Sequence, residues 1–246
     1  MAWKTRYMPC LIALLGLMVG CSSEKTDSTT TPMQAAAPFQ QGERIVFFGD
    51  SITEAGVQPG GYVALINQHL RQAYPDLGIE VIGAGISGNK VPDLLARVER
   101  DVLAHAPTLV VIYIGINDVW HWYEFDPEGT EEAVYEAGLG TLLETIGKAG
   151  ARVLLCTPSV IGERHDGTNE SDALLETYVA ISRSVAERHA VPVCDLHRDF
   201  MSYLKEHNPD NQAEGILTTD GVHLNAAGNQ FVAERILAAL EAVSPE

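Results

Sequence analysis

The sequence predicts an α/β fold in which a five-stranded parallel sheet lies between two layers of helices. Short apolar runs bounded by turn residues alternate with stretches of helical periodicity, a rhythm typical of this class. Length agrees, because the ~200 residues that follow the N-terminal segment suit a single domain with one hydrophobic core.

The five predicted strands are the apolar runs. They span residues 44–49, 79–84, 109–114, 152–158 and 192–196. Helical spacing is seen from Tyr62 to Leu70 and from Leu94 to Val102, and then over 131–149 and 173–189. Asn225 is a suitable N-cap for a final helix. Five strands in this rhythm predict a flavodoxin-like strand order and a three-layer α/β/α architecture.

The N-terminus has the features of an export signal. Two basic residues precede an apolar run from Leu11 to Val19, which is too short for an ordinary transmembrane helix. The pattern that ends in Gly20-Cys21 resembles a bacterial lipobox. We therefore expect residues 1–20 to be a lipoprotein signal peptide and Cys21 to carry the lipid, with an ordinary secretory signal as the alternative.

Residues 21–42 are mostly polar, so we interpret them as a flexible tether, and residues 43–246 as the folded domain. Both interpretations of the N-terminus predict export; the lipidated one predicts a cell-envelope lipoprotein at the periplasmic or outer-membrane face. The lipid is the membrane anchor that we expect, and the sequence does not indicate an oligomeric state.

The net charge limits the partners of the chain, and the cysteine positions indicate the state of its thiols. The chain has 16 basic and 33 acidic residues, a net charge of −17, which should repel nucleic acids and other polyanions. Of four cysteines, Cys10 would leave with the signal and Cys21 would be lipidated. Cys156 and Cys194 lie in neighbouring predicted strands, where we expect buried free thiols, although export also permits a disulfide.

Polar motifs follow the first three predicted strands. Gly49-Asp50-Ser51 follows the first strand, Gly85-Ile86-Ser87-Gly88 the second, and Gly115-Ile116-Asn117-Asp118 the third. A fourth motif, Asp220-Gly221-Val222-His223, precedes the final helix. Because the carboxyl ends of parallel strands share one edge of the sheet, we expect these motifs to converge there.

Together the motifs supply the parts of a nucleophilic reaction. A serine hydroxyl needs a base, which His223 provides for Ser51, and Asp220 can orient the imidazole through Nδ1–H. The N–H groups of Ser51 and Gly88 and the Asn117 amide can stabilise an oxyanion. Singly, each motif has a plainer reading as a turn, a cap or an Asx turn. We interpret the neighbouring aspartates, 50 and 118, as loop-bracing carboxylates.

In this order the four motifs resemble those of the SGNH (GDSL-type) hydrolases, and the likeness spans about Glu43 to Val243. The resemblance implies the SGNH hydrolase fold and an esterase with an acyl-enzyme intermediate. It assigns catalysis to Ser51, Asp220 and His223. It assigns the oxyanion hole to Ser51, Gly88 and Asn117. The chain departs from many members in having Gly83 where they carry Asn.

Aromatic residues crowd the segment after the third motif. We predict that Trp120, His121 and Trp122 contact the substrate, while packing of a loop onto the domain is the alternative. Acidic residues among these rings favour a short-acyl ester, such as an acetylated carbohydrate, over a long acyl chain. A lysophospholipase, a thioesterase and a non-catalytic envelope binding protein with the same fold stay as other possibilities.

The segment Gly83–Gly88 also matches the dinucleotide-binding pattern G-x-G-x-x-G. That pattern requires a helix at the last glycine and an acidic residue at the end of the next strand. Here Pro92 delays the helix, and Glu99 and Asp101 fall within helical periodicity. We therefore expect no nucleotide cofactor, and no set of residues has the spacing of a metal site.

Overall fold

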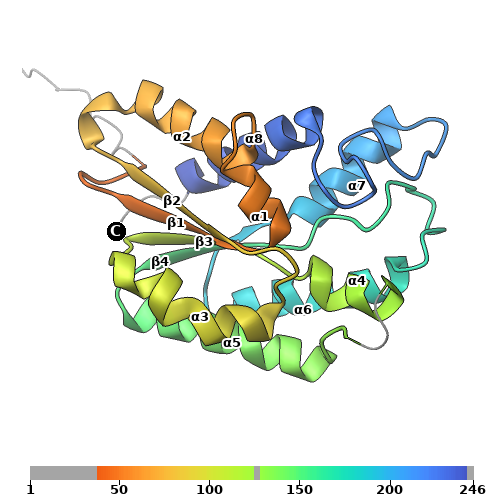
Figure 1. The fold of residues 1–246 in the computed structure, drawn as a ribbon, viewed down its shortest axis with the longest axis horizontal. Helices are drawn as coiled ribbons and strands as arrows, with labels where there is room; N and C mark the ends of the chain where they lie inside the picture. Colours follow the sequence, from red (N-terminus) through yellow and green to blue (C-terminus); the bar gives the residue numbers. More distant parts are fainter. Residues whose placement is uncertain (1–37, 125–127, 243–246) are drawn as a thin grey trace, which may run out of the picture. The chain divides into compact units, whose positions relative to one another are not determined.

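The fold is that of a computed structural model, which describes residues 38–124 and 128–242 (Figure 1). The predicted signal peptide, Cys21 and most of the predicted tether lie outside the described residues. Within the described ranges, no helix has both the length and the apolar character needed to cross a membrane.

Five parallel strands form one sheet in the order β2-β1-β3-β4-β5, which confirms the predicted flavodoxin-like order. The strands are β1 (Arg44–Gly49), β2 (Glu80–Gly85), β3 (Leu109–Tyr113), β4 (Arg152–Cys156) and β5 (Val193–Cys194). Strand β1, which lies between β2 and β3, pairs with β2 from Arg44 to Gly49 and with β3 from Ile45. Almost every side chain of β1 and β3 is buried, as expected for a sheet covered on both faces.

Helices cover both faces of the sheet. They are α1 (Ser51–Gly56), α2 (Tyr62–Ala73), α3 (Val91–Asp101), α4 (Ile116–Glu124), α5 (Glu132–Lys148), α6 (Asp172–Arg188), α7 (Leu196–His207) and α8 (Ala226–Ala242), with 3₁₀ turns at Pro75–Leu77 and Leu103–His105. Helices α2 and α8 pack together on one face, and α3, α5 and α6 pack on the other (Figure 1). The predicted α/β/α layers are therefore present.

Three predicted segments differ from the structure. The fourth strand ends at Cys156 and not at residue 158. The last strand ends at Cys194, because the Asp195 side chain caps α7 by accepting from the N–H of Arg198 at 3.2 Å. The segment that contains Trp120, expected to be a loop, is instead the helix α4. Cys156 and Cys194 are buried free thiols at paired positions of β4 and β5, and burial raises the pKa of Cys156 above its usual range.

Helix α1 lies directly against β2, and this close packing explains the glycines there. A Cβ atom at Gly85 would lie 2.1 Å from the backbone nitrogen of Glu54, and one at Gly83 would lie 2.1 Å from Val57 Cγ1. Helix α3 begins at Val91 and not at Gly88. Two of the glycines that match the nucleotide pattern, Gly83 and Gly85, therefore allow close packing of the helix whose first residue is Ser51, whereas nothing lies within 4 Å of a Cβ at Gly88.

Candidate active site

Ser51, His223 and Asp220 form one hydrogen-bonded series at the carboxyl edge of the sheet. Ser51 Oγ lies 2.9 Å from His223 Nε2, and His223 Nδ1 lies 2.7 Å from Asp220 Oδ2. A carboxylate can only accept, so Nδ1 carries the proton and Nε2 is left to accept from the serine hydroxyl. Ser51 and His223 are 172 positions apart in sequence. The predicted convergence of the first and last motifs is therefore confirmed.

The loop that carries His223 is braced from within. Asp220 Oδ1 accepts from the N–H groups of Val222 and His223 at 3.0 and 2.7 Å. Partial burial works to raise the pKa of Asp220, but the hydrogen bonds from the His223 ring and from these N–H groups outweigh it. The pKa of Asp220 therefore lies below its usual value, and the carboxylate is ionised near neutral pH.

A buried carboxylate that the sequence analysis missed holds the preceding segment. Glu163 is fully buried, and its carboxylate accepts from the N–H groups of Ile216, Leu217 and Thr218 at 2.7, 2.6 and 2.6 Å. Next to it, the N–H of Gly162 donates to Gly221 O at 2.8 Å. Residues after β4 thus fix the backbone on which Asp220 and His223 stand. More than 50 residues separate the partners, so no local pattern could have revealed them.

The loop after β2 lies beside the segment that leads into Ser51, since the N–H of Ile86 donates to Gly49 O at 3.3 Å. Gly88 has φ +76°, a left-handed conformation that favours glycine, and no hydrogen bond between described residues uses its N–H. Asn117 lies in the first turn of α4, is 3% exposed, and donates from Nδ2 to Asn89 O at 3.0 Å. An amide nitrogen has two hydrogens, so one donor of Asn117 steadies the Gly88 loop and the second is available.

Arg97 joins the two loops that flank Ser51. This side chain is 6% exposed and lies over the Phe48 ring. Its guanidinium donates to Gly49 O at 2.8 Å, to Ala84 O at 2.9 Å and to Asn89 Oδ1 at 2.7 Å. One rigid fork therefore connects the end of β1, the end of β2 and the loop of Gly88.

The two aspartates interpreted as loop braces occupy that role. Asp50 Oδ1 caps α1 by accepting from the N–H of Ile52 at 2.9 Å, and Asp118 Oδ1 accepts from the N–H of Val91 at 3.1 Å. Burial raises the pKa of Asp50 to about 7 and that of Asp118 to about 6. Both carboxyls thus have pKa values near neutral pH, and Asp50 directly precedes Ser51 in sequence.

The aromatic residues predicted to contact substrate are placed differently from one another. The Trp120 ring meets the His223 ring edge to face, with centroids 6.0 Å apart. Trp122 lies against Gly129, and burial lowers the pKa of the half-buried His121. Tyr123 is exposed on the same helix as Trp120. Phe125 lies outside the described residues.

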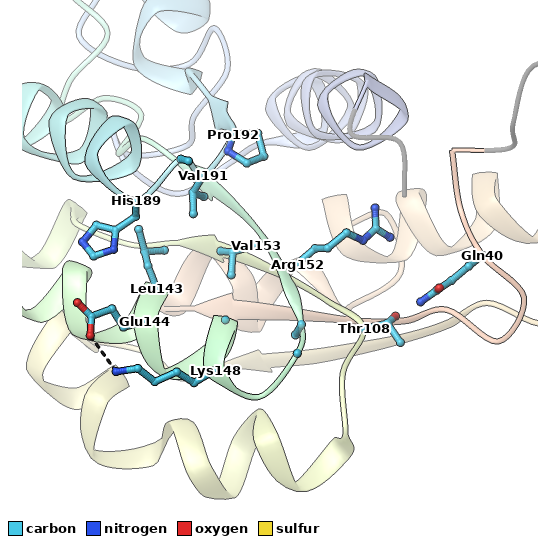
Figure 2. Close-up of a pocket in the computed structure, with 14 residues that line it drawn as sticks. Gln40, Thr108, Leu143, Glu144, Lys148, Arg152, Val153, His189, Val191 and Pro192 are labelled. Carbon is cyan, nitrogen blue, oxygen red and sulfur yellow. Dashed lines mark hydrogen bonds and ion pairs between the residues drawn. The ribbon is translucent and has the colours of Figure 1, made fainter. Parts of the chain in front are cut away.

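Trp120 and Tyr123 line a hollow of about 260 Å³ that is also bounded by Asp220. A larger hollow, of about 740 Å³, lies at the amino ends of β4 and β5, far from Ser51 along the strands; Lys148 and Glu144 pair across its wall (Figure 2). Of these two hollows, the smaller one is bounded by a residue of the Ser51–His223–Asp220 series, namely Asp220. Within the described ranges, no cluster of side chains could hold a metal ion.

Residues 47–231 match the GDSL-like Lipase/Acylhydrolase family. The chain belongs to this family. The resemblance of the four motifs to GDSL-type hydrolases is therefore confirmed, and this GDSL-like protein is a carboxylic ester hydrolase. The matched region begins within β1 and ends within α8, so it covers strands β2 to β5 and all the residues of the candidate site.

Individual relatives are similar over most of the domain. An acetylxylan esterase of Geobacillus stearothermophilus is 37% identical over 80% of this chain and 93% of its own length. The crystal structure of an acetyl xylan esterase named AlAXEase superposes with a TM-score of 0.78 and 43% identity, over 80% of this chain and 98% of that one. The structure of the Geobacillus stearothermophilus esterase Axe2 superposes with a TM-score of 0.73 and 34% identity, over 82% and 95%.

Proposed function

We propose that this GDSL-like hydrolase removes acetyl groups from a carbohydrate through an acyl-enzyme intermediate. The observation that carries the proposal is the unbroken hydrogen-bonded series from Asp220 through His223 to Ser51. The similarity to acetylxylan esterases supports the substrate class. Three structures of Axe2 are described as catalytic mutants, in which a serine, an aspartate or a histidine is replaced by alanine, and these residue types agree with the roles proposed here.

In the first half of the reaction, Ser51 Oγ attacks the ester carbonyl carbon while His223 Nε2 takes the hydroxyl proton. The carbonyl oxygen becomes an oxyanion, held by the N–H groups of Ser51 and Gly88 and by the second hydrogen of the Asn117 amide. The ionised Asp220 stabilises the imidazolium. When the tetrahedral intermediate collapses, the bond to the alcohol oxygen breaks and His223 gives that oxygen the proton.

In the second half, a water molecule attacks the acetyl group on Ser51, with His223 again taking a proton. Collapse of this intermediate returns the proton to Ser51 Oγ and releases acetic acid. The chain's own residues supply the nucleophile, the base and the oxyanion donors, so we propose that no cofactor takes part.

Replacement of the nucleophile tests the proposal. Ser51→Ala should remove acetate release from acetylated xylan and labelling by a fluorophosphonate, with an unchanged circular dichroism spectrum. Ser202→Ala, which changes an exposed serine of α7, is the matched control and should retain both properties. Acetate release by Ser51→Ala at the unmodified rate would contradict the mechanism. If the unmodified protein is labelled but releases no acetate from carbohydrates, its substrate would be a different class of ester.

We also propose that the protein is exported and anchored by a lipid on Cys21. The support is in the sequence, where a basic start, an apolar run and Gly20-Cys21 stand in the order of a lipoprotein signal. One acylated terminus accounts for membrane association without a spanning helix. Cys21→Ser should move the protein from the membrane to the soluble fraction. A variant that stays with the membrane would show that another anchor exists.

A further inference from the structure

The hollow beside Asp220, named the Asp220 hollow below, is formed by three parts of the chain. Trp120 and Tyr123 of α4 form one wall. Residues after β4 form a second, namely Ile161, Gly162, Arg164, Asn169, Glu170 and Ser171. The third consists of Ala213, Glu214 and the segment 220–222. These parts lie far apart in sequence, and Glu163 and Gly162 tie the second to the third.

The position of the hollow determines which part of an ester can reach it. His223 Nε2 faces Ser51, and Nδ1 faces Asp220. The leaving alcohol must lie near the imidazole, because Nε2 gives it the proton, whereas the carbonyl oxygen points to the proposed oxyanion donors, none of which lines the hollow. The Trp120 ring touches the imidazole and also lines the hollow, so the surface continues from the catalytic base into it. The hollow therefore lies on the alcohol side.

The lining is suited to a ligand with many hydroxyl groups. Trp120 and Tyr123 offer aromatic surface for the apolar face of a sugar ring. Arg164, Glu170 and Glu214 are exposed, and none of their side chains takes part in a hydrogen bond or ion pair with another described residue. Such side chains can donate to and accept from hydroxyl groups without breaking an existing contact.

Charge then distinguishes between classes of sugar. Glu170, Glu214 and Asp220 bring three carboxylates to the lining, against the single cation of Arg164. The excess negative charge opposes a uronate or a phosphorylated sugar and leaves a neutral sugar favoured. The net charge of −17 on the whole chain acts in the same direction.

We propose that the Asp220 hollow is a subsite for a neutral sugar unit next to the one that carries the acetyl group. The inference rests on the proposed function. An imidazole ring and two hydrogen bonds separate Ser51 Oγ from Asp220, so an alcohol part must extend beyond the acetylated ring to fill the hollow. With this subsite, the enzyme should prefer acetylated oligosaccharides over single acetylated sugars.

The test compares two substrates, an acetylated neutral xylo-oligosaccharide and 4-nitrophenyl acetate. In the double variant Tyr123→Ala/Arg164→Ala, kcat/KM for the oligosaccharide should fall about tenfold relative to kcat/KM for the aryl ester, mainly through KM. Arg71→Ala, which changes an exposed arginine of α2, is the control and should keep the ratio. An unchanged ratio in the double variant would overturn the subsite.

A second arm tests the charge argument. In Glu170→Gln/Glu214→Gln, kcat/KM for an acetylated oligosaccharide that carries a uronic acid should rise relative to the neutral one, and equal changes for both would contradict the proposed preference. Direct titration of Ser51→Ala with a neutral xylo-oligosaccharide separates the two proposals. If Ser51→Ala binds the oligosaccharide and adding Tyr123→Ala/Arg164→Ala removes this binding, the subsite is supported even if the enzyme does not hydrolyse carbohydrate esters. If Ser51→Ala does not bind the oligosaccharide, the subsite is overturned even if hydrolysis of such esters is observed.

Discussion

Asp50, the residue before the proposed nucleophile, should make the stability of this protein depend on pH. Its carboxyl is 1% exposed, and burial raises its pKa to about 7, with a further increase from the nearby Asp118. The hydrogen bond from Ile52 partly offsets these effects. In the unfolded chain the same carboxyl ionises near 3.8. Over the interval between these values the folded protein holds a proton that the unfolded chain has lost.

The sign of the effect follows from this difference in bound protons. Because the folded state binds more protons, the free energy of unfolding decreases as pH rises from about 4 to about 7. The difference between about 7 and 3.8, at 1.36 kcal/mol per unit, corresponds to about 4 kcal/mol over the whole interval. From pH 5 upward the remaining loss is about 3 kcal/mol, or roughly 6–12 °C in Tm for a domain of this size.

Asp50→Asn isolates this contribution. An asparagine side chain still caps α1 through its oxygen, but it does not titrate, so the variant should lose less stability than the unmodified protein between pH 5 and pH 8. Urea unfolding at four pH values measures the two profiles. Asp118 titrates in both proteins, and its contribution largely cancels in the comparison. Asp76→Asn, an exposed position, is the control. Parallel profiles for Asp50→Asn and the unmodified protein would refute the reasoning.

Four other predictions concern the site. Asn117→Ala should lower kcat by a factor of about 10²–10³, equivalent to about 2.7–4 kcal/mol of lost transition-state stabilisation, with little change in KM. A raised KM at constant kcat would instead make Asn117 a binding residue. Arg97→Lys keeps the charge but loses the fork that joins three acceptors, so kcat should fall while fluorophosphonate labelling slows in parallel, and unchanged rates would rule out a positioning role. Glu163→Gln places an amide donor against the N–H groups of residues 216–218, so the free energy of unfolding measured with urea should fall by about 1–3 kcal/mol. An unchanged midpoint would show that the Glu163 carboxylate does not stabilise this segment. Acetyl and butyryl esters should be cleaved with higher kcat/KM than lauroyl esters, because acidic residues such as Glu128, Glu131 and Glu132 follow the aromatic segment of Trp120 and add charge that a long acyl chain would have to desolvate. A preference for lauroyl esters would contradict this.

Local patterns in the sequence were enough for the architecture. Buried strands appear in the sequence as apolar runs, and helices appear as apolar residues at 3.6-residue spacing. The parallel sheet and its strand order could therefore be predicted, and the strand boundaries were predicted to within one or two residues. The exceptions have local causes of their own. The last strand was predicted too long because Asp195 caps a helix inside an apolar run. The helix α4 was mistaken for a loop because its first residues, Asn117 and Asp118, are typical turn formers.

The groups proposed to react could also be predicted from the sequence. Ser51 and His223 stand in short motifs, and the parallel sheet brings the motifs after its strands to one edge, so their meeting could be predicted without coordinates. Tertiary structure alone decided what supports and surrounds them. The fork of Arg97, the clamp of Glu163 and the Asp220 hollow each join segments that are distant in the chain. Neighbours in sequence do not signal such contacts. Arg97 and Glu163 are buried charges whose hydrogen-bonding partners come from distant segments, and the hollow exists only where three such segments meet.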